Sequence, residues 1–280
     1  MKVVILTLNQ GNQKALSHKI AEVCEISAIV LSENIPRKKL SRLQQARRFA
    51  NRISNRLVGR PFVDTWFKML GQYDKLYPNF PDVPLVNVKN INDKATIETL
   101  EKYAPDLIIV SGTNLVGGKI IKESKKGKGI VNLHTGISPY VKGGPNCTNW
   151  CLAKNWFHLI GNTVMWLDAG IDTGKIISTE QTPLAGDELL FELHWKVMEH
   201  AHDLYVRAIH QIAESSEVPS VQQSSICEGT LFYTDDWNFA AMRSALKNFR
   251  NNYAQYFSDR KKQNKLSAEL NLISLSHLEY

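Results

Sequence analysis

The sequence predicts an α/β protein with a Rossmann-like, mostly parallel twisted sheet, helices on both faces and a small C-terminal extension. Apolar runs of four to five residues alternate with helical periodicity along most of the chain. Buried parallel strands joined by crossover helices produce this alternation. The composition agrees, because 280 residues with 43% hydrophobic and 22% charged side chains exclude disordered, collagen-like and disulfide-scaffold classes.

The N-terminal segment begins this alternation. The expected order is strand 3–8, a turn at 9–12, a helix ending near Glu25 and strand 27–31. These elements form a βαβ unit, in which the crossover makes the strands parallel. The turn lacks a GxGxxG pattern, although its single Gly11 would let an anion approach the helix N-terminus. A plain turn is the simpler alternative.

The segment 36–60 is strongly basic. It carries nine Lys and Arg residues and no acid. Its charge therefore exceeds the net charge of +7 of the whole chain, and the rest of the chain carries −2. Apolar residues at three-, four- and seven-residue steps predict an amphipathic helix between Pro36 and Gly59. In the aromatic and Pro-rich stretch 62–84 we expect an irregular excursion that builds a binding surface. The alternative is a helix and loop packed against the domain.

The later elements follow in regular order. The sequence predicts strands at 85–88, 106–110 and 129–132, helices at 92–103, 117–124, 145–155 and 187–213, and extended segments at 158–167 and 175–181. The polar stretch 214–225 predicts a linker between a main domain, 1–213, and an extension, 214–280. Within the extension we expect an extended segment at 229–233, a helix near 236–254 and a polar tail from Asp259.

Cysteine and histidine usage predicts no metal site. The four cysteines form no CxxC pair, which fits a reducing compartment. Cys147 and Cys151 are better explained as structural thiols, because no further ligand follows at a recognisable spacing. The histidines of 187–213 lie on different helix faces.

No run of about 18 apolar residues could span a bilayer, and strand 3–8 is too short for a secretory signal, so we expect a cytoplasmic protein.

Polar side chains gather where strand 129–132 ends. Asn132 closes the strand and His134 follows two residues later, so both side chains leave the same side of the backbone at the carboxyl edge of the sheet. Downstream, Asp168 and Asp172 bracket Gly170. An amide, an imidazole and a carboxylate can together perform acyl transfer, because the first two stabilise an oxyanion and the third helps to move protons. Capping and turn formation are the alternative roles.

These residues resemble the folate-dependent formyltransferases that use 10-formyltetrahydrofolate. The family pattern Asn-x-His-x-Ser-Leu-Leu-Pro-x-Tyr-Arg-Gly aligns without gaps on residues 132–143. The later Leu/Ile-Asp-Thr-Gly pattern matches 171–174, and the Pro-Asp-hydrophobic-Gly segment matches 104–112. The resemblance is strong over about 85–185 and continues in element order over 1–213.

The resemblance implies a role for each matched residue. Asn132 and His134 would contact the formyl group and its oxyanion, while Asp172 would orient His134 and a proton-shuttling water. The pterin of 10-formyltetrahydrofolate would be held by the backbone of Gly112, Thr113, Asn114 and Leu115 and by the loop from Asp168 through Gly170 to Asp172. No metal is implied.

The loop after His134 departs from the family pattern. The family's Ser, second Leu, Tyr and Arg are here Gly136, Ser138, Val141 and Lys142. The frame is kept but the usual side chains are not, so the acceptor chemistry is expected to differ from that of the commonest members.

The resemblance leaves three acceptors open: methionyl-tRNA, glycinamide ribonucleotide and nucleoside-diphosphate-linked amino-deoxysugars. The tRNA enzymes append a β-barrel, whereas the residues after 213 are predicted to be mostly helical. The purine-pathway enzymes begin with a Gly-rich phosphate loop that 9–12 represents poorly. Residues 146–150, 62–81 and 229–236 are similar to bacterial sugar N-formyltransferases. They favour a small nucleotide-linked aminosugar, used for surface polysaccharides such as lipopolysaccharide O-antigen, over a nucleic acid.

The acceptor is expected to lie near Gly11, Lys142, Gly143, Asn146 and Trp150. Most charges of 36–60 are expected to face solvent, with one or two binding phosphate, and an anionic membrane surface is the other alternative. A homodimer is implied by the resemblance. Outside enzymes, the alternative is a non-catalytic folate- or nucleotide-binding homologue.

Overall fold

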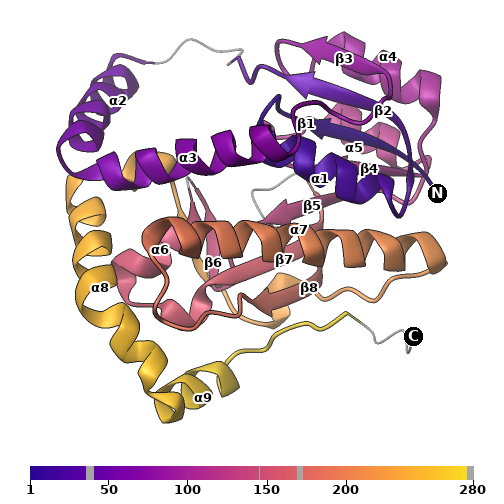
Figure 1. Ribbon diagram of the computed structural model, residues 1–280. Helices are drawn as coiled ribbons and strands as arrows, with labels where there is room; N and C mark the ends of the chain where they lie inside the picture. The colour runs from indigo at the N-terminus through magenta and orange to yellow at the C-terminus, as the bar shows by residue number, and fades with distance from the viewer. Residues whose placement is uncertain (36–40, 145, 169–172, 276–280) are drawn as a thin grey trace.

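A seven-stranded sheet forms the centre of the computed structural model (Figure 1), which describes residues 1–35, 41–144, 146–168 and 173–275. The strands, in their order across the sheet, are β3 (Leu85–Val88), β2 (Glu25–Ser32), β1 (Lys2–Thr7), β4 (Leu107–Val110), β5 (Ile130–His134), β7 (Gly161–Trp166) and β8 (Ile176–Gln181). The pairs among β1 to β5 are parallel, whereas β5–β7 and β7–β8 are antiparallel. The predicted mostly parallel α/β fold is therefore confirmed.

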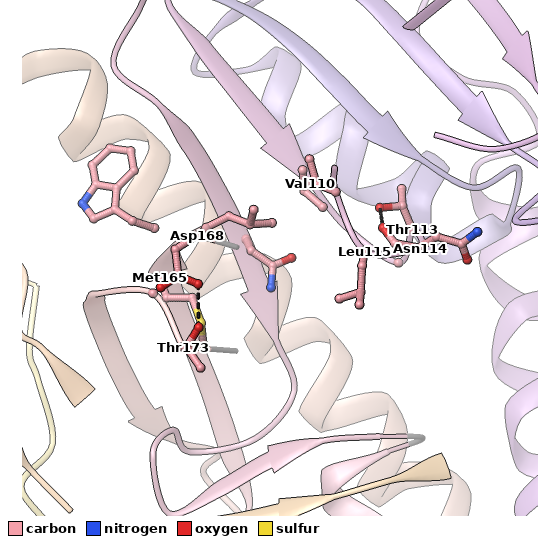
Figure 2. Close-up of a pocket in the computed structure, with 13 residues that line it drawn as sticks. Val110, Thr113, Asn114, Leu115, Met165, Asp168 and Thr173 are labelled. Carbon is pink, nitrogen blue, oxygen red and sulfur yellow. Dashed lines mark hydrogen bonds between the residues drawn. The ribbon is translucent and has the colours of Figure 1, made fainter. Parts of the chain in front are cut away.

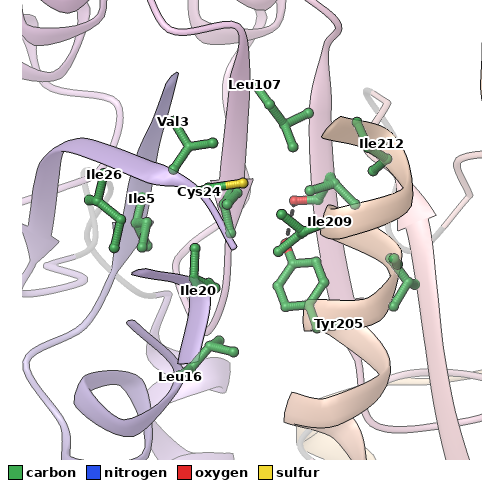
Figure 3. Close-up of a cluster of buried hydrophobic side chains, with 14 of the residues drawn as sticks. Val3, Ile5, Leu16, Ile20, Cys24, Ile26, Leu107, Tyr205, Ile209 and Ile212 are labelled. Atoms are coloured by element: carbon green, nitrogen blue, oxygen red, sulfur yellow. Dashed lines mark hydrogen bonds between the residues drawn. The ribbon is translucent and has the colours of Figure 1, made fainter. Parts of the chain in front are cut away.

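Helices cover both faces of this sheet, and alternate residues of β1 pack against each layer. Val3 and Ile5 belong to a core formed with helices α1 (Gly11–Ala21) and α7 (Leu190–Glu214), shown in Figure 3. Val4 and Leu6 belong to the opposite core, formed with helices α4 (Lys94–Tyr103) and α5 (Gly118–Ser124). Because successive side chains of a strand point to opposite faces, a fully apolar strand of this kind must be covered twice. The first helix ends earlier than predicted, since Glu25 already begins β2.

Tyr205 of α7 contacts the neighbouring strands β4 and β5. Its side chain is fully buried, and its hydroxyl lies 2.9 Å from the carbonyl oxygen of Val110 and 2.7 Å from that of Val131. A buried hydroxyl requires such partners. The hydroxyl hydrogen is shared between the two carbonyl oxygens, so Tyr205 links the carboxyl end of β4 to β5 at the residue before Asn132.

The segment between β2 and β3 is more helical than expected. Helix α2 (Arg42–Ser54) continues through a π-helical turn (Asn55–Gly59) into α3 (Arg60–Leu76). The predicted helix end at Gly59 is therefore wrong. For the stretch after it, the alternative of a helix and loop packed against the domain is confirmed, because α3 packs on α1 and α7. Gly59 adopts a helical φ of −77°, and Pro61 occupies the first turn of α3, where proline needs no N–H partner.

The extension packs back onto the main sheet. Helices α8 (Phe239–Ser258) and α9 (Arg260–Ala268) follow a short strand, β9 (Thr230–Phe232), which pairs with β6 (Val141–Gly143) in a second sheet. The polar tail predicted from Asp259 is therefore partly helical. Beyond α9 the chain runs along β8, where the N–H of Thr179 donates to the Ile273 carbonyl at 2.7 Å. The predicted linker 214–225 is also attached to β8, through backbone bonds of 2.8 Å between Val221 and Ile176.

The remaining helical elements lie near their predicted positions. Helix α6 (Cys147–Lys154) replaces the predicted 145–155, and a short 3₁₀ turn (Phe157–Leu159) precedes β7. In the described part of the chain, no helix has both the length and the apolar character needed to cross a bilayer.

Candidate active site

A cavity of about 130 Å³ opens at the carboxyl edge of the sheet, where β4, β5 and β7 end (Figure 2). Figure 2 shows Thr113 and Leu115 on one side of it and Met165 and Asp168 on the other. Its wall includes six of the residues predicted from the sequence: Gly112, Thr113, Asn114, Leu115, Asn132 and Asp168. The structure thus brings together residues that lie as far apart in sequence as Gly112 and Asp168.

Asn132 and His134 occupy one face of β5. Asn132 pairs with Met165 and His134 with Thr163 of the antiparallel strand β7, so the two side chains are separated by one pleat of the same strand. Asn132 lines the cavity, whereas His134 is buried, with 8% of its surface exposed.

A backbone carbonyl group lies beside the ring of His134. Its Nε2 lies 3.2 Å from the carbonyl oxygen of Val141, to which it donates in the tautomer that carries the proton on Nε2. In the neutral imidazole, Nδ1 is then the acceptor. A backbone carbonyl group therefore holds the ring at Nε2.

This imidazole also contacts Cys147, the first residue of α6, which was not predicted from the sequence. The Sγ atom of Cys147 lies 3.4 Å from Nε2 of His134 and 3.5 Å from the Gly143 carbonyl oxygen. The signal was present in the departure at Gly136. A Cβ at that position would lie 2.7 Å from both His134 Nε2 and the Cβ of Cys147, so Gly136 leaves room for the pair.

Two asparagines hold the loop that follows β4. Asn34 accepts from the Asn114 N–H at 3.0 Å and donates to the Gly112 carbonyl at 3.3 Å. Asn92 donates to the Leu115 carbonyl at 2.8 Å and accepts from the Gly117 N–H. Sequence reasoning assigned neither residue, although both follow predicted strands at the same sheet edge, which is where such side chains meet.

The loop after β7 forms the other wall. The hydroxyl of Thr173 donates to Asp168 at 2.5 Å, and Gly174 lies so close to Trp166 that a Cβ would meet the Trp166 carbonyl oxygen. The predicted residues Gly170 and Asp172 lie outside the described residues, as does Ile171 between them.

Of the residues predicted to bind the acceptor, Gly11 lies against α3, apart from the other four, which lie in or beside β6 and α6. Gly11 is buried against α3, where a Cβ would lie 2.5 Å from the Leu70 carbonyl oxygen, so it serves helix packing. Lys142 donates to the Glu228 carbonyl at 3.0 Å. Gly143 has a φ of +87° and lies against Phe232 in the small sheet. Trp150 is 4% exposed and stacks on Phe232 at 4.3 Å, which places its ring in the core.

Asn146 is different, because it both caps α6 and faces open space. Its Oδ1 accepts from the Asn149 N–H at 3.3 Å, satisfying one free N–H of the first helical turn. The same side chain lines a second, larger cavity beside α3. Within the described ranges, no cluster of three or more His, Cys, Asp or Glu side chains could hold a metal ion.

Comparisons with known proteins identify a family and several relatives. The model of the formyl transferase family matches residues 2–209. Methionyl-tRNA formyltransferase from Clostridium tetani is 33% identical over 132 residues, which cover 47% of this chain and 42% of that protein. The corresponding enzyme from Syntrophus aciditrophicus is 31% identical over 137 residues, covering 49% and 43%. The match therefore spans less than half the length of these relatives.

Solved structures share the fold at lower identity. Phosphoribosylglycinamide formyltransferase from Bacillus halodurans superposes with a TM-score of 0.52 and 19% identity, covering 78% of this chain and 97% of that one. A sugar N-formyltransferase from Shewanella sp. superposes with a TM-score of 0.52 and 12% identity, covering 88% of each chain.

Proposed function

The chain belongs to the formyl transferase family, and from this premise we propose that it transfers a formyl group from 10-formyltetrahydrofolate to the primary amine of a nucleoside-diphosphate-linked amino-deoxysugar. The observation that carries the proposal is the placement of Asn132 and His134 on one face of β5, beside a cavity walled by residues 112–116 and Asp168. An amide donor and a proton acceptor at the edge of a parallel sheet suit acyl transfer to a neutral amine.

The residues of the cavity fit a folate co-substrate. Gly112 has a φ of +74°, which turns the loop 112–116 so that its backbone lines the cavity, and the loop is fixed in place by Asn34 and Asn92. Backbone N–H and carbonyl groups of this loop that Asn34 and Asn92 do not engage would face the donor and acceptor edge of a pterin. When bound, 10-formyltetrahydrofolate supplies the formyl carbon that the amine attacks.

Each side chain of the site then has a defined task. The Asn132 amide donates to the formyl oxygen as negative charge develops there. The imidazole of His134 accepts a proton from the attacking amine, which becomes the amide nitrogen when the bond from the formyl carbon to its former nitrogen breaks. Asp172, by family resemblance, orients His134 and a water that returns the proton to the leaving nitrogen.

A small acceptor is supported by the region that follows α7. There β9 completes the small sheet with β6, and α8 packs against α6. Phe232 and Trp237 contribute to the same buried cluster as Trp150. This region therefore covers the N-terminal end of α6, next to Cys147 and His134.

Methionyl-tRNA is the second candidate acceptor, because the relative that is 33% identical over 132 residues acts on it by name. The two candidates differ in a direct assay. Purified protein would be incubated with 10-formyltetrahydrofolate and either nucleotide-linked aminosugars or methionyl-tRNA, and the products analysed by mass spectrometry. Formylation of the tRNA without any sugar product would refute the sugar proposal.

Substitution tests the site itself. Asn132→Ala and His134→Ala are each expected to reduce the transfer rate by about 10²-fold or more, the usual cost of losing an oxyanion donor. Asn87→Ala is the matched control, because Asn87 is exposed on β3, away from the cavity. Rates within a few-fold of the parent for both site variants would remove the assignment of Asn132 and His134, whereas folate binding by the parent without turnover of any amine would indicate a non-catalytic binding protein.

A further inference from the structure

A second cavity, of about 310 Å³, lies between α3, α6, α7 and the turn that precedes α8. Aromatic side chains form most of its wall: Phe62, Trp66, Phe67 and Trp237. Trp237 lies beyond residues 2–209, the part of the chain matched by the family model, and the other three lie in the helical segment between β2 and β3. The cavity is thus built largely from parts of the chain that do not position Asn132 and His134.

The lining of this cavity carries no charged side chain among the described residues. A wall of aromatic rings without a cation or carboxylate suits an uncharged planar group, which it can hold by stacking, and does not suit a phosphate. Phe62 and Trp237 meet edge to face at 5.5 Å, and Phe67, 66% exposed, stands at the rim.

Two polar side chains of the wall have unused hydrogen-bonding groups. Asn149 is 7% exposed, and its buried Oδ1 has no partner in the described chain. His194 is also 7% exposed, and burial lowers its pKa to about 4. Its imidazole is therefore neutral at pH 7 and presents one donor and one acceptor. Buried polar groups left in this way are expected to find partners in a ligand.

The cavity and the candidate catalytic imidazole lie on opposite sides of the first turn of α6. Cys147 contacts His134, whereas Asn149, two residues later on α6, lines the cavity. Two residues correspond to roughly 200° around a helix of about 10 Å diameter. A ligand group in the cavity is therefore separated from the site of amine attack by about the width of one helix, which suits the far end of an extended acceptor.

Basic residues lead directly into the cavity wall. Arg52, Arg56 and Arg60 are all exposed and precede Phe62 on the continuous helical segment. Such residues create a positive field beside an uncharged cavity, which favours an acceptor with an anionic linker next to a neutral ring.

Building on the proposed function, we propose that this cavity binds the nucleobase of the nucleotide-linked acceptor, stacking it on the aromatic wall and reading its edge with Asn149 and His194. The diphosphate then spans the first turn of α6, and the sugar amine reaches His134. The cavity therefore selects the nucleotide, and the family site performs the transfer.

Calorimetric titration of the full chain with UDP, dTDP and GDP tests this assignment, with pyrophosphate as the control ligand. At least one nucleotide is expected to bind ten-fold or more tightly than pyrophosphate. Phe67→Ala is expected to weaken that binding about ten-fold, the usual loss when a base loses an aromatic partner. Leu76→Ala is the matched control, because Leu76 is an apolar residue of α3 that is 59% exposed and does not line the cavity. His194→Phe keeps an aromatic ring and is expected to reduce discrimination among the three bases.

Two results would overturn the inference. One is pyrophosphate binding as tight as nucleotide binding, or no nucleotide binding at all. The other is a nucleotide Kd that stays within two-fold of the parent in both Phe67→Ala and His194→Phe. Phe67-dependent binding of N-acetylmethioninamide in place of the nucleotides would instead assign the cavity to a methionyl acceptor. Formyl transfer measured on the same preparations separates the two proposals, because intact nucleotide binding without any sugar product refutes only the proposed function.

Discussion

Cys147 Sγ lies 3.4 Å from Nε2 of His134, and the two side chains are 8% exposed or less. The thiol also lies 3.5 Å from the carbonyl oxygen of Gly143, so it fills the space between the imidazole and the start of α6. Together with the contact between Nε2 and the Val141 carbonyl oxygen, this contact holds the plane of the ring, which a proton acceptor needs.

Removal of this thiol is expected to impair transfer without unfolding the protein. In Cys147→Ala the imidazole gains freedom to rotate away from its acceptor geometry, so kcat should fall by about ten-fold or more, while KM for the acceptor changes little. The pH dependence of kcat should also shift, because the surroundings of the titrating imidazole change. Steady-state rates between pH 5.5 and 9 measure both effects.

Cys151→Ala is the matched control for that experiment. Cys151 lies one turn later on α6, is fully buried, and contacts the Leu159 carbonyl rather than His134. Equal losses of kcat in the two variants, with unchanged pH profiles, would mean that the Cys147 thiol only fills the core.

Asn92→Ala is expected to raise KM for 10-formyltetrahydrofolate several-fold more than it lowers kcat. The substitution removes both bonds that hold residues 115–117, so the loop must be ordered at the moment of binding. Asn87→Ala serves again as the control, because it alters an exposed side chain on the neighbouring strand β3. A KM that does not change would show that the loop 112–117 is fixed by other contacts or does not touch the folate.

The sheet was predictable because each buried strand is a continuous apolar run. The predicted strand positions differ from β1 to β5 by two residues or fewer at either end. The continuous connection between α2 and α3 could not be predicted, since Gly59 followed by Pro61 resembles a helix end as much as a helix start. Strand β6 was missed because three residues give no periodicity, and its pairing with β9 depends on contacts between residues about 90 positions apart.

The site was predictable to the extent that sheet topology fixes it. Asn132 and the loop 112–116 line one cavity because β4 and β5 are parallel neighbours. The contacts of Cys147 and Asn92 depend on how α6 and the turn after β3 pack, which local sequence does not specify. In each case a short polar or small residue at a strand end was the only available signal.

Glu188→Gln is expected to loosen the extension. The buried carboxylate accepts bonds of 2.7 to 2.8 Å from two backbone N–H groups, from Lys196 and from Tyr253 of α8. Burial opposes its ionisation, but these bonds prevail and lower its pKa to about 2. The charged form therefore stabilises the fold above pH 4.5, and this stabilisation is lost as the pH falls from about 4.5 to 2.

Denaturant unfolding at pH 7 measures the effect of this change. The loss of bonds to a buried charge should lower the free energy of unfolding by about 2 kcal/mol. Asp187→Asn, which changes the adjacent and exposed carboxylate, should have little effect. Equal stability of the Glu188→Gln and Asp187→Asn variants would contradict a structural role for the Glu188 charge.

His202 predicts a separate loss of stability at milder acidity. It is 1% exposed on α7, and burial together with nearby Lys19 lowers its pKa from 6.5 to about 3. Below pH 6.5 the unfolded chain takes up a proton that the folded chain refuses, so stability falls with pH by about 2 kcal/mol at pH 5. His202→Leu removes this penalty, so its free energy of unfolding should change less between pH 7 and 5 than that of the parent.

The carboxylate of Glu188 does not contribute in this window, because its stabilisation is lost only below about pH 4.5. His194, with a pKa of about 4, adds a second penalty of the same sign, so a variant lacking both imidazoles should be flatter still. A slope as steep in His202→Leu as in the parent would assign the acid sensitivity to another group.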